Sequence, residues 1–218
     1  MFEKLVNSKI NDVADWIIRL IMLNIMVIFF SLAVVTIYPA ISAGYNMFND
    51  YTNQKSPRLF VDYFKYFKES LVHKIIVGVI ILAGFAIVYL NIRYYDLSLQ
   101  QNTSWFYWVG YYISLALIAI WFAVTLFSIM VVRVRSDIGF IKLLKMSFFL
   151  AGKYYWITLL LVVITFSPFL LILYPTAITA LIFILVGLSG PLLLNALLTR
   201  RVVRYLEGLG EHNGPSRN

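Results

Sequence analysis

Long apolar stretches, separated by short polar segments, dominate the pattern along this chain. A helix must present about 20 largely apolar residues to cross the hydrocarbon of a bilayer. Five stretches meet that requirement, and they are Trp16–Tyr38, Ile75–Ile92, Phe106–Val132, Tyr155–Leu173 and Thr176–Leu198. The pattern therefore predicts an all-α membrane protein, a bundle of five transmembrane helices. The first stretch is longer than the apolar core of a signal peptide, so we expect a retained helix.

Two further segments are too polar to span a membrane but show helical spacing of their apolar residues. The first begins at Ser56 and Pro57, a pair typical of a helix start. Its apolar residues recur every three or four positions, and they are Leu59, Phe60, Tyr63, Phe64, Phe67 and Leu71. The second segment contains Lys142 and Lys145 and precedes the fourth apolar stretch. We predict amphipathic interfacial helices before the second and the fourth transmembrane helix.

The two amphipathic segments also resemble each other. Residues 64–70 (Phe-Lys-Tyr-Phe-Lys-Glu-Ser) align with residues 141–147 (Ile-Lys-Leu-Leu-Lys-Met-Ser), so that two lysines and a serine keep their spacing. A parallel internal repeat would relate unit 16–92 to unit 106–173. A fifth helix, 176–198, and a cytoplasmic tail, 199–218, would complete a single integral membrane domain, 1–218. Because any two basic amphipathic helices share part of this match, chance similarity is the alternative.

Composition supports the membrane class, since 61% of the residues are hydrophobic and 13% are charged, against about 25% charged in soluble domains. The 18 Lys and Arg exceed the 10 Asp and Glu, which fits short cytoplasmic loops better than a nucleic-acid partner. In the five-helix arrangement, one side of the membrane carries fourteen cations: Lys55, Arg58, Lys65, Lys68, Lys74, Arg133, Arg135, Lys142, Lys145, Lys153, Arg200, Arg201, Arg204 and Arg217. The other side carries Lys4, Lys9, Arg19 and Arg93. Because cationic loops stay cytoplasmic, we predict a multi-pass protein of the cell membrane with its N-terminus outside and its C-terminus inside.

Residue types that carry catalysis are scarce in this sequence. The chain has no cysteine, and its two histidines, His73 and His212, do not cluster with a third metal ligand. The sequence contains no glycine-rich phosphate loop, no His-Glu-x-x-His and no Gly-x-Ser-x-Gly. We therefore predict no catalytic residue, no metal, no cofactor and no enzymatic activity. Asp15 and Arg19 have the i,i+4 spacing of an ion pair that anchors a helix at the membrane edge.

Neutral polar residues and helix breakers lie inside the apolar stretches instead. Asn24 lies in the first stretch, and Asn195 lies in the fifth, together with Ser189, Gly190 and Pro191. Polar side chains commonly form hydrogen bonds across membrane helices, and a Gly-Pro break permits either a kink or a binding site. These five residues are therefore candidates for interhelical bonding or for the lining of a cavity.

Part of the chain resembles the YesL-like family of bacterial membrane proteins. The resemblance rests on residues 24–32 (Asn-Ile-Met-Val-Ile-Phe-Phe-Ser-Leu), residues 35–40 (Val-Thr-Ile-Tyr-Pro-Ala), the segment from Phe60 to Lys68, and the stretch from Gly190-Pro191 to Asn195. Tyr38 stands where the family commonly has glycine, which argues against a tight backbone there. The resemblance implies a multi-pass membrane protein linked with carbohydrate-uptake and polysaccharide-degradation genes. It implies no established activity and no ligand-binding residues.

These observations lead to one main hypothesis and two alternatives. The main hypothesis is a non-enzymatic protein, accessory to carbohydrate uptake or utilisation, that contacts transporter subunits or another membrane partner. The contact residues would be Lys65, Lys68, Lys142 and Lys145, on the basic cytoplasmic segments. The first alternative is a transporter of a small solute such as a sugar, with Asn24 and Asn195 in its cavity. The second is that the basic segments mainly bind anionic lipid.

Overall fold

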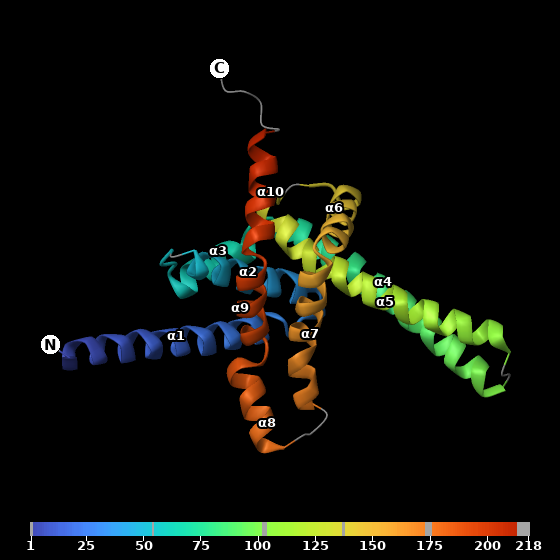
Figure 1. The fold of residues 1–218 in the computed structure, drawn as a ribbon, viewed down its shortest axis with the longest axis horizontal. Helices are drawn as coiled ribbons and strands as arrows, with labels where there is room; N and C mark the ends of the chain where they lie inside the picture. The colour runs from blue at the N-terminus through green and yellow to red at the C-terminus, as the bar shows by residue number, and fades with distance from the viewer. Residues whose placement is uncertain (1, 54, 102–103, 137, 173–175, 213–218) are drawn as a thin grey trace. The chain divides into compact units, whose positions relative to one another are not determined.

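The fold is described from a computed structural model (Figure 1). It describes residues 2–53, 55–101, 104–136, 138–172 and 176–212, with side chains from Val13 to Leu170 and from Thr176 to Gly208 within those ranges. The described residues form helices and connecting turns and contain no strand, which confirms the all-α class. The helices are α1 Phe2–Phe30, η1 Val34–Thr36, α2 Ile37–Thr52, α3 Leu59–Lys68, α4 Leu71–Gln101, α5 Trp105–Val134, α6 Phe140–Lys153, α7 Tyr155–Ile172, α8 Ala177–Ile182, η2 Phe183–Gly187, α9 Ser189–Leu198 and α10 Arg200–His212.

Three helical segments among the described residues are long and apolar enough to cross a membrane. They are Val13–Phe30 of α1, α4 and α5. Two bent pairs raise the number to as many as five if each pair is one span: α6 with α7, which meet at 101°, and Ala177–Gly187 with Ser189–Leu198, which meet at 43°. The structure therefore supports three to five apolar spans, and the exact bundle of five stays a prediction. The end of the predicted fourth stretch, Leu173, lies outside the described residues.

The first predicted helix is wrong at its C-terminal end. Instead of running to Tyr38, α1 ends at Phe30, and a separate helix, α2, begins at Ile37. The Thr36 hydroxyl stabilises this break, because its single proton can be donated to the carbonyl oxygen of Phe30 at 2.6 Å or to that of Ala33 at 2.8 Å. Pro39 falls in the first turn of α2, where its missing N–H costs no helical hydrogen bond.

The described residues divide into two compact units. The first unit comprises residues up to Leu71 together with Val163–Arg201, and the second comprises Val72–Val162 together with residues from Val202 onward. In the first unit, α2 is the central helix, because every residue from Tyr38 to Thr52 except Ile41 is buried. A Cβ added at Gly44 would lie 2.8 Å from Val27 of α1 and 3.1 Å from Leu192 of α9. The absence of a side chain at this position lets both helices approach α2 closely.

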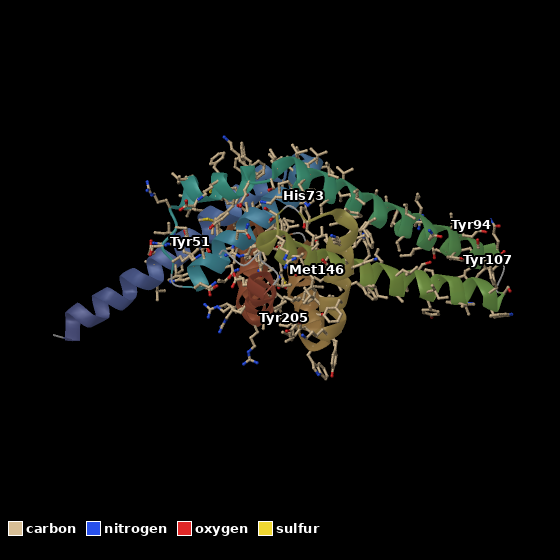
Figure 2. All side chains as sticks on the ribbon, turned by 90° about the horizontal axis from the view of Figure 1, so that it is seen from above. Tyr51, His73, Tyr94, Tyr107, Met146 and Tyr205 are labelled. Atoms are coloured by element: carbon tan, nitrogen blue, oxygen red, sulfur yellow. The ribbon has the colours of Figure 1, made fainter. Side chains whose placement is uncertain are left out.

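The second unit contains the long antiparallel hairpin of α4 and α5, which run side by side in both views (Figures 1 and 2). Two glycines receive aromatic rings from the opposite helix: Trp121 lies against Gly84, and Tyr95 lies against Gly110. Gly84 and Tyr95 lie on α4 with the same spacing that Gly110 and Trp121 have on α5. Both contacts therefore fit a single antiparallel alignment of the two helices. The Trp121 indole N–H also donates to the Ile81 carbonyl oxygen at 3.0 Å.

The surface of α4 is apolar on all sides. In the most apolar 18-residue segment of α4, only 17% of the residues are buried inside the structure, against 50% in the corresponding segment of α5. Exposed side chains such as Val79, Ile87 and Leu90 therefore lie outside any protein core. A helix that is hydrophobic all round is normally either a buried core helix or a membrane span. Since α4 is mostly unburied, its composition is compatible with a membrane protein.

The two predicted amphipathic helices are present as α3 and α6, but they end differently. A residue in the left-handed region, Ser70 with φ of 51°, turns the chain from α3 into α4 directly after Lys68. The aligned Ser147 lies instead in the interior of α6, which continues to Lys153. The internal repeat therefore stays a prediction, with different helix boundaries in its two copies.

The hairpin contacts generate a first prediction. A Gly84→Ala substitution places a methyl group against the Trp121 ring, and overpacking of this kind costs about 1–3 kcal/mol of unfolding free energy. In the matched control, Gly152→Ala, the new Cβ meets nothing within 4 Å, and the better helix former should add about 0.5–1 kcal/mol. Thermal unfolding in detergent measures both. Equal shifts for the two variants would show that Gly84 is not a contact point.

Candidate functional site

Asn24 is the central polar residue of the first unit. Its side-chain nitrogen donates to the carbonyl oxygens of Phe183 at 3.1 Å and Ile184 at 2.6 Å. Its side-chain oxygen accepts from the backbone N–H groups of Leu188 and Ser189, each at 2.8 Å. The side chain is completely buried. One amide thus bonds four backbone groups that lie on both sides of the break between η2 and α9.

The break itself follows from the sequence of the last apolar stretch. Pro191 has no N–H to donate to the carbonyl of Gly187, and its ring would clash with that carbonyl in a continuous helix. The chain responds with a π-helical turn, η2, before α9 begins at Ser189. The Phe183 ring packs over Gly187, where an added Cβ would lie 2.7 Å from it. The backbone groups that Asn24 binds lie in this π-helical turn and directly after it.

A second polar connection joins α2, α7 and α9. The Tyr45 hydroxyl lies 2.7 Å from the Thr199 hydroxyl, which donates to the Asn195 carbonyl oxygen at 2.6 Å. The Asn195 side-chain nitrogen donates to the Thr165 hydroxyl oxygen at 3.0 Å. Among the described residues, the Asn195 side-chain oxygen has no hydrogen-bond partner. These bonds hold three helices of the unit together.

The predicted cavity residues are divided between two locations. Gly190 and Pro191 line a groove of about 280 Å³ beside the break. The remaining lining residues of this groove are Ser167, Pro168, Ile182, Val186, Gly187 and Leu194. Asn24, Ser189 and Asn195 do not line it, because they are buried in interhelical contacts. The structure therefore brings the five predicted residues into one region without forming a polar cavity from them.

The polar face of α2 is a feature that the sequence reasoning missed. Asn46, Asn49 and Asp50 are all buried. The Asp50 carboxylate accepts a hydrogen bond from the Tyr66 hydroxyl and pairs with the Lys55 ammonium at 3.4 Å. The sequence contains a pattern that indicates this polar face, because polar residues recur at helical spacing at Ser42, Tyr45, Asn46 and Asn49.

Two buried tyrosines connect α2 to its neighbours. The Tyr63 hydroxyl of α3 donates to the Ala40 carbonyl oxygen at 3.3 Å, and burial raises the pKa of this phenol, which keeps the donor protonated. Burial is also the main cause that raises the pKa of Tyr51, while the nearby Arg19 guanidinium lowers it. Arg19 forms the expected ion pair with Asp15 at 2.7 Å and lies over the Tyr51 ring. The pair therefore fixes α1 to α2.

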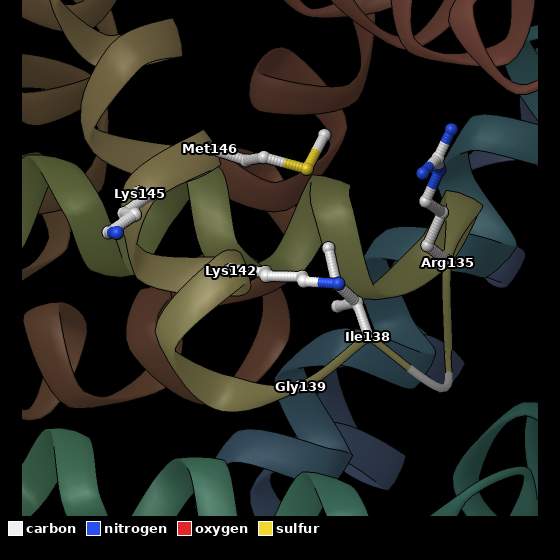
Figure 3. Close-up of a pocket in the computed structure, with 6 residues that line it drawn as sticks. All are labelled: Arg135, Ile138, Gly139, Lys142, Lys145 and Met146. Carbon is white, nitrogen blue, oxygen red and sulfur yellow. The ribbon is translucent and has the colours of Figure 1, made fainter. Parts of the chain in front are cut away.

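The four predicted surface lysines are all exposed. Lys65 and Lys68 lie on α3, and Lys142 and Lys145 lie on α6. The two α6 lysines line a pocket of about 470 Å³ (Figure 3). The other residues that line this pocket are Arg135, Ile138, Gly139 and Met146. Within the described part of the chain, no group of three or more His, Cys, Asp or Glu side chains is arranged to hold a metal ion.

The apolar helices and the polar contacts between them are compatible with an integral membrane protein. A family model described as "Protein of unknown function, DUF624" matches residues 20–92, which is less than half of the chain. This segment contains Asn24, α2, α3 and most of α4. No curated protein and no solved structure matches the chain. Membership of the YesL-like family therefore stays a prediction.

The geometry around Asn24 generates a second prediction. Asn24→Ala leaves four backbone groups without their partner, and the expected loss is about 2–4 kcal/mol of unfolding free energy. Asn91→Ala is the matched control, because the exposed Asn91 side chain donates to the Ile87 carbonyl oxygen of its own helix and to no other group among the described residues. Hydrogen exchange should rise at Leu188 and Ser189 in the Asn24 variant alone. Unchanged exchange at these two amides would contradict this assignment.

Proposed function

We propose that this chain is a non-enzymatic, five-span protein of the cell membrane that assists carbohydrate uptake or utilisation by contacting a transporter subunit. Its N-terminus lies outside and its C-terminus inside in this proposal. The observation that carries the proposal is the pair of exposed basic helices, α3 and α6, which present four lysines away from the cores of their units. The carbohydrate link rests on the resemblance to the YesL-like family.

The geometry of α6 supports a position along the membrane surface. This helix meets α7 at 101°, so that α6 lies nearly parallel to the bilayer if α7 crosses it. Ile141 and Phe148 are 69% and 62% exposed and lie on one face at helical spacing. The exposed Lys142 lies about 100° around the helix axis from Ile141. An amphipathic helix in the interface presents this combination of apolar and cationic side chains.

Charge complementarity defines the partner. Exposed lysines on a cytoplasmic surface attract an acidic protein surface and fix its orientation. In α3 the exposed apolar residues Phe60 and Phe64 lie beside Lys65 and Lys68, so the surface offers both apolar contact and charge. The partner surface in this proposal is therefore acidic and partly apolar, and its assignment to a membrane-embedded transporter subunit rests on the resemblance to the YesL-like family.

A small-solute transporter is the second candidate function. The groove beside the Gly190–Pro191 break favours it, since solute sites in carriers lie at discontinuous helices. Two observations weigh against it. Ser167 is the one polar side chain among the described residues that line the groove, and the Asn24 amide is already fully engaged by backbone groups.

The proposed topology gives a third prediction, which the absence of cysteine makes simple to measure. A single cysteine at Lys65, Lys145 or Arg204 should react with a membrane-impermeant maleimide only after the cells are permeabilised. A cysteine at Gln100 should react in intact cells, because the turn between α4 and α5 lies outside. The cysteine-free chain is the blank. Labelling of the Lys145 position in intact cells would overturn the topology.

The partner contact gives a fourth prediction. Charge reversal of Lys65, Lys68, Lys142 and Lys145 to Glu should reduce co-purification of a carbohydrate-transporter subunit in mild detergent by about tenfold or more. The Lys4→Glu, Lys9→Glu variant is the control, since it reverses cations on the other side of the membrane. If no transporter subunit is enriched with the unchanged protein over a matched membrane control, the proposed partner is wrong.

A further inference from the structure

The groove beside the last helix break has a proline in each of its two walls. Pro168 lies inside α7, and Pro191 lies in the first turn of α9. Proline has no N–H, so the carbonyl of the residue four positions earlier loses its helical donor. The two carbonyls in question belong to Ile164 and Gly187. In an apolar environment, each of these oxygens needs another donor.

The chain supplies such a donor to one of the two carbonyls. The Ser167 hydroxyl donates to the Ile164 carbonyl oxygen at 2.8 Å, which is a common arrangement beside proline in membrane helices. The first N–H after Pro191 is that of Leu192, and it donates to Leu188 at 3.2 Å. No side chain among the described residues donates to the Gly187 carbonyl oxygen. Gly187 itself lines the groove, so a ligand there lies beside a carbonyl that lacks the donor of a regular helix.

The lining of the groove limits the kind of ligand that it accepts. None of the described lining residues is ionisable, and Ser167 is the one with a polar side chain. A charged ligand would lose its hydration there without gaining a partner. The volume of about 280 Å³ is slightly below the range of about 300–1,000 Å³ that is typical of small-molecule sites, so the groove holds one end of a larger molecule. Ile182 and Leu194 are 44% and 46% exposed, which leaves the groove open to the surrounding lipid in the proposed topology.

We propose that this groove binds a neutral membrane lipid whose free hydroxyl group donates to the Gly187 carbonyl oxygen. The apolar lining contacts the hydrocarbon of the lipid, and the single carbonyl fixes its orientation, as a few polar groups do in most ligand sites. Either a diacylglycerol or a long-chain alcohol has this chemistry. The proposal rests on the membrane location in the proposed function, and it does not involve the transporter subunit.

The first test compares pairs of lipids that differ only in the hydroxyl group. The probes are dioctanoylglycerol with its acetyl ester, and dodecanol with its methyl ether. Native mass spectrometry of the purified full-length protein measures the apparent affinity for each probe. In at least one pair, the hydroxyl form should bind about three- to tenfold more tightly than the blocked form. The pair with the larger preference identifies the source of the hydroxyl, and equal affinities within both pairs would overturn the proposal.

The two prolines provide a matched pair of variants. Pro191→Ala returns an N–H that can donate to the Gly187 carbonyl oxygen, so the preference for the hydroxyl form should fall below about twofold. Pro168→Ala is the control, because the Ile164 carbonyl that it would serve already accepts from Ser167. The control should keep the full preference. If both variants lose the preference, or if neither does, the assignment to Gly187 is wrong.

A third variant tests the location of the site. Gly190→Leu places a side chain in the groove, since a Cβ added at Gly190 lies 3.2 Å from Val186, which also lines it. The affinity for both members of the preferred pair should fall by about tenfold or more, while thermal unfolding in detergent stays cooperative. Gly152→Leu is the control, because its Cβ meets nothing within 4 Å. Unchanged binding by the folded Gly190 variant would place the lipid elsewhere and contradict the site. Since no transporter subunit is present, these results are independent of the partner experiment.

Discussion

The four hydrogen bonds of the Asn24 amide satisfy the constraint on which the first unit depends. Where a helix is interrupted in an apolar environment, the freed N–H and C=O groups need partners inside the protein. The last apolar stretch has such an interruption before Pro191, and the side chain that binds the backbone beside it comes from α1, far away in the sequence. The same bonds therefore fix the position of α1 against η2 and α9, and α2 packs against both α1 and α9 through Gly44.

The two units join their helices by different means. In the first unit, side-chain amides and hydroxyls such as Asn24, Asn195 and Tyr45 bond to neighbouring helices. In the second unit, the aromatic rings of Trp121 and Tyr95 pack against Gly84 and Gly110 of the opposite helix. Lipid tails are as apolar as side chains, so burial of apolar surface supplies little attraction between membrane helices. Hydrogen bonds and close approach at small residues are the contributions that remain, and each unit relies mainly on one of them.

Sequence patterns predicted the helical class and the two long apolar helices, because apolar runs as long as those of α4 and α5 are typical of membrane helices and rare elsewhere. Three features were beyond such reasoning. The end of α1 depends on a hydroxyl of Thr36 that bends back to Phe30, and α2 is a buried helix whose polar face resembles a loop in composition. The pairing of Asn24 with Leu188 connects residues whose separation in sequence leaves no periodic signal. The polarity of Asn24 marked it as important, but only the fold identifies its partners.

Charge counting assigns the lysines of α3 and α6 to one side of a membrane, and it treats them as equivalent. Their local surroundings differ in the part of the chain that the structure describes. The Asp62 carboxylate accepts from the Arg58 N–H at the start of α3. Lys142 and Lys145 instead line a pocket together with Arg135, Ile138, Gly139 and Met146. Two segments that align in sequence therefore place their aligned lysines in different surroundings, because the neighbouring residues that decide this lie outside the aligned positions.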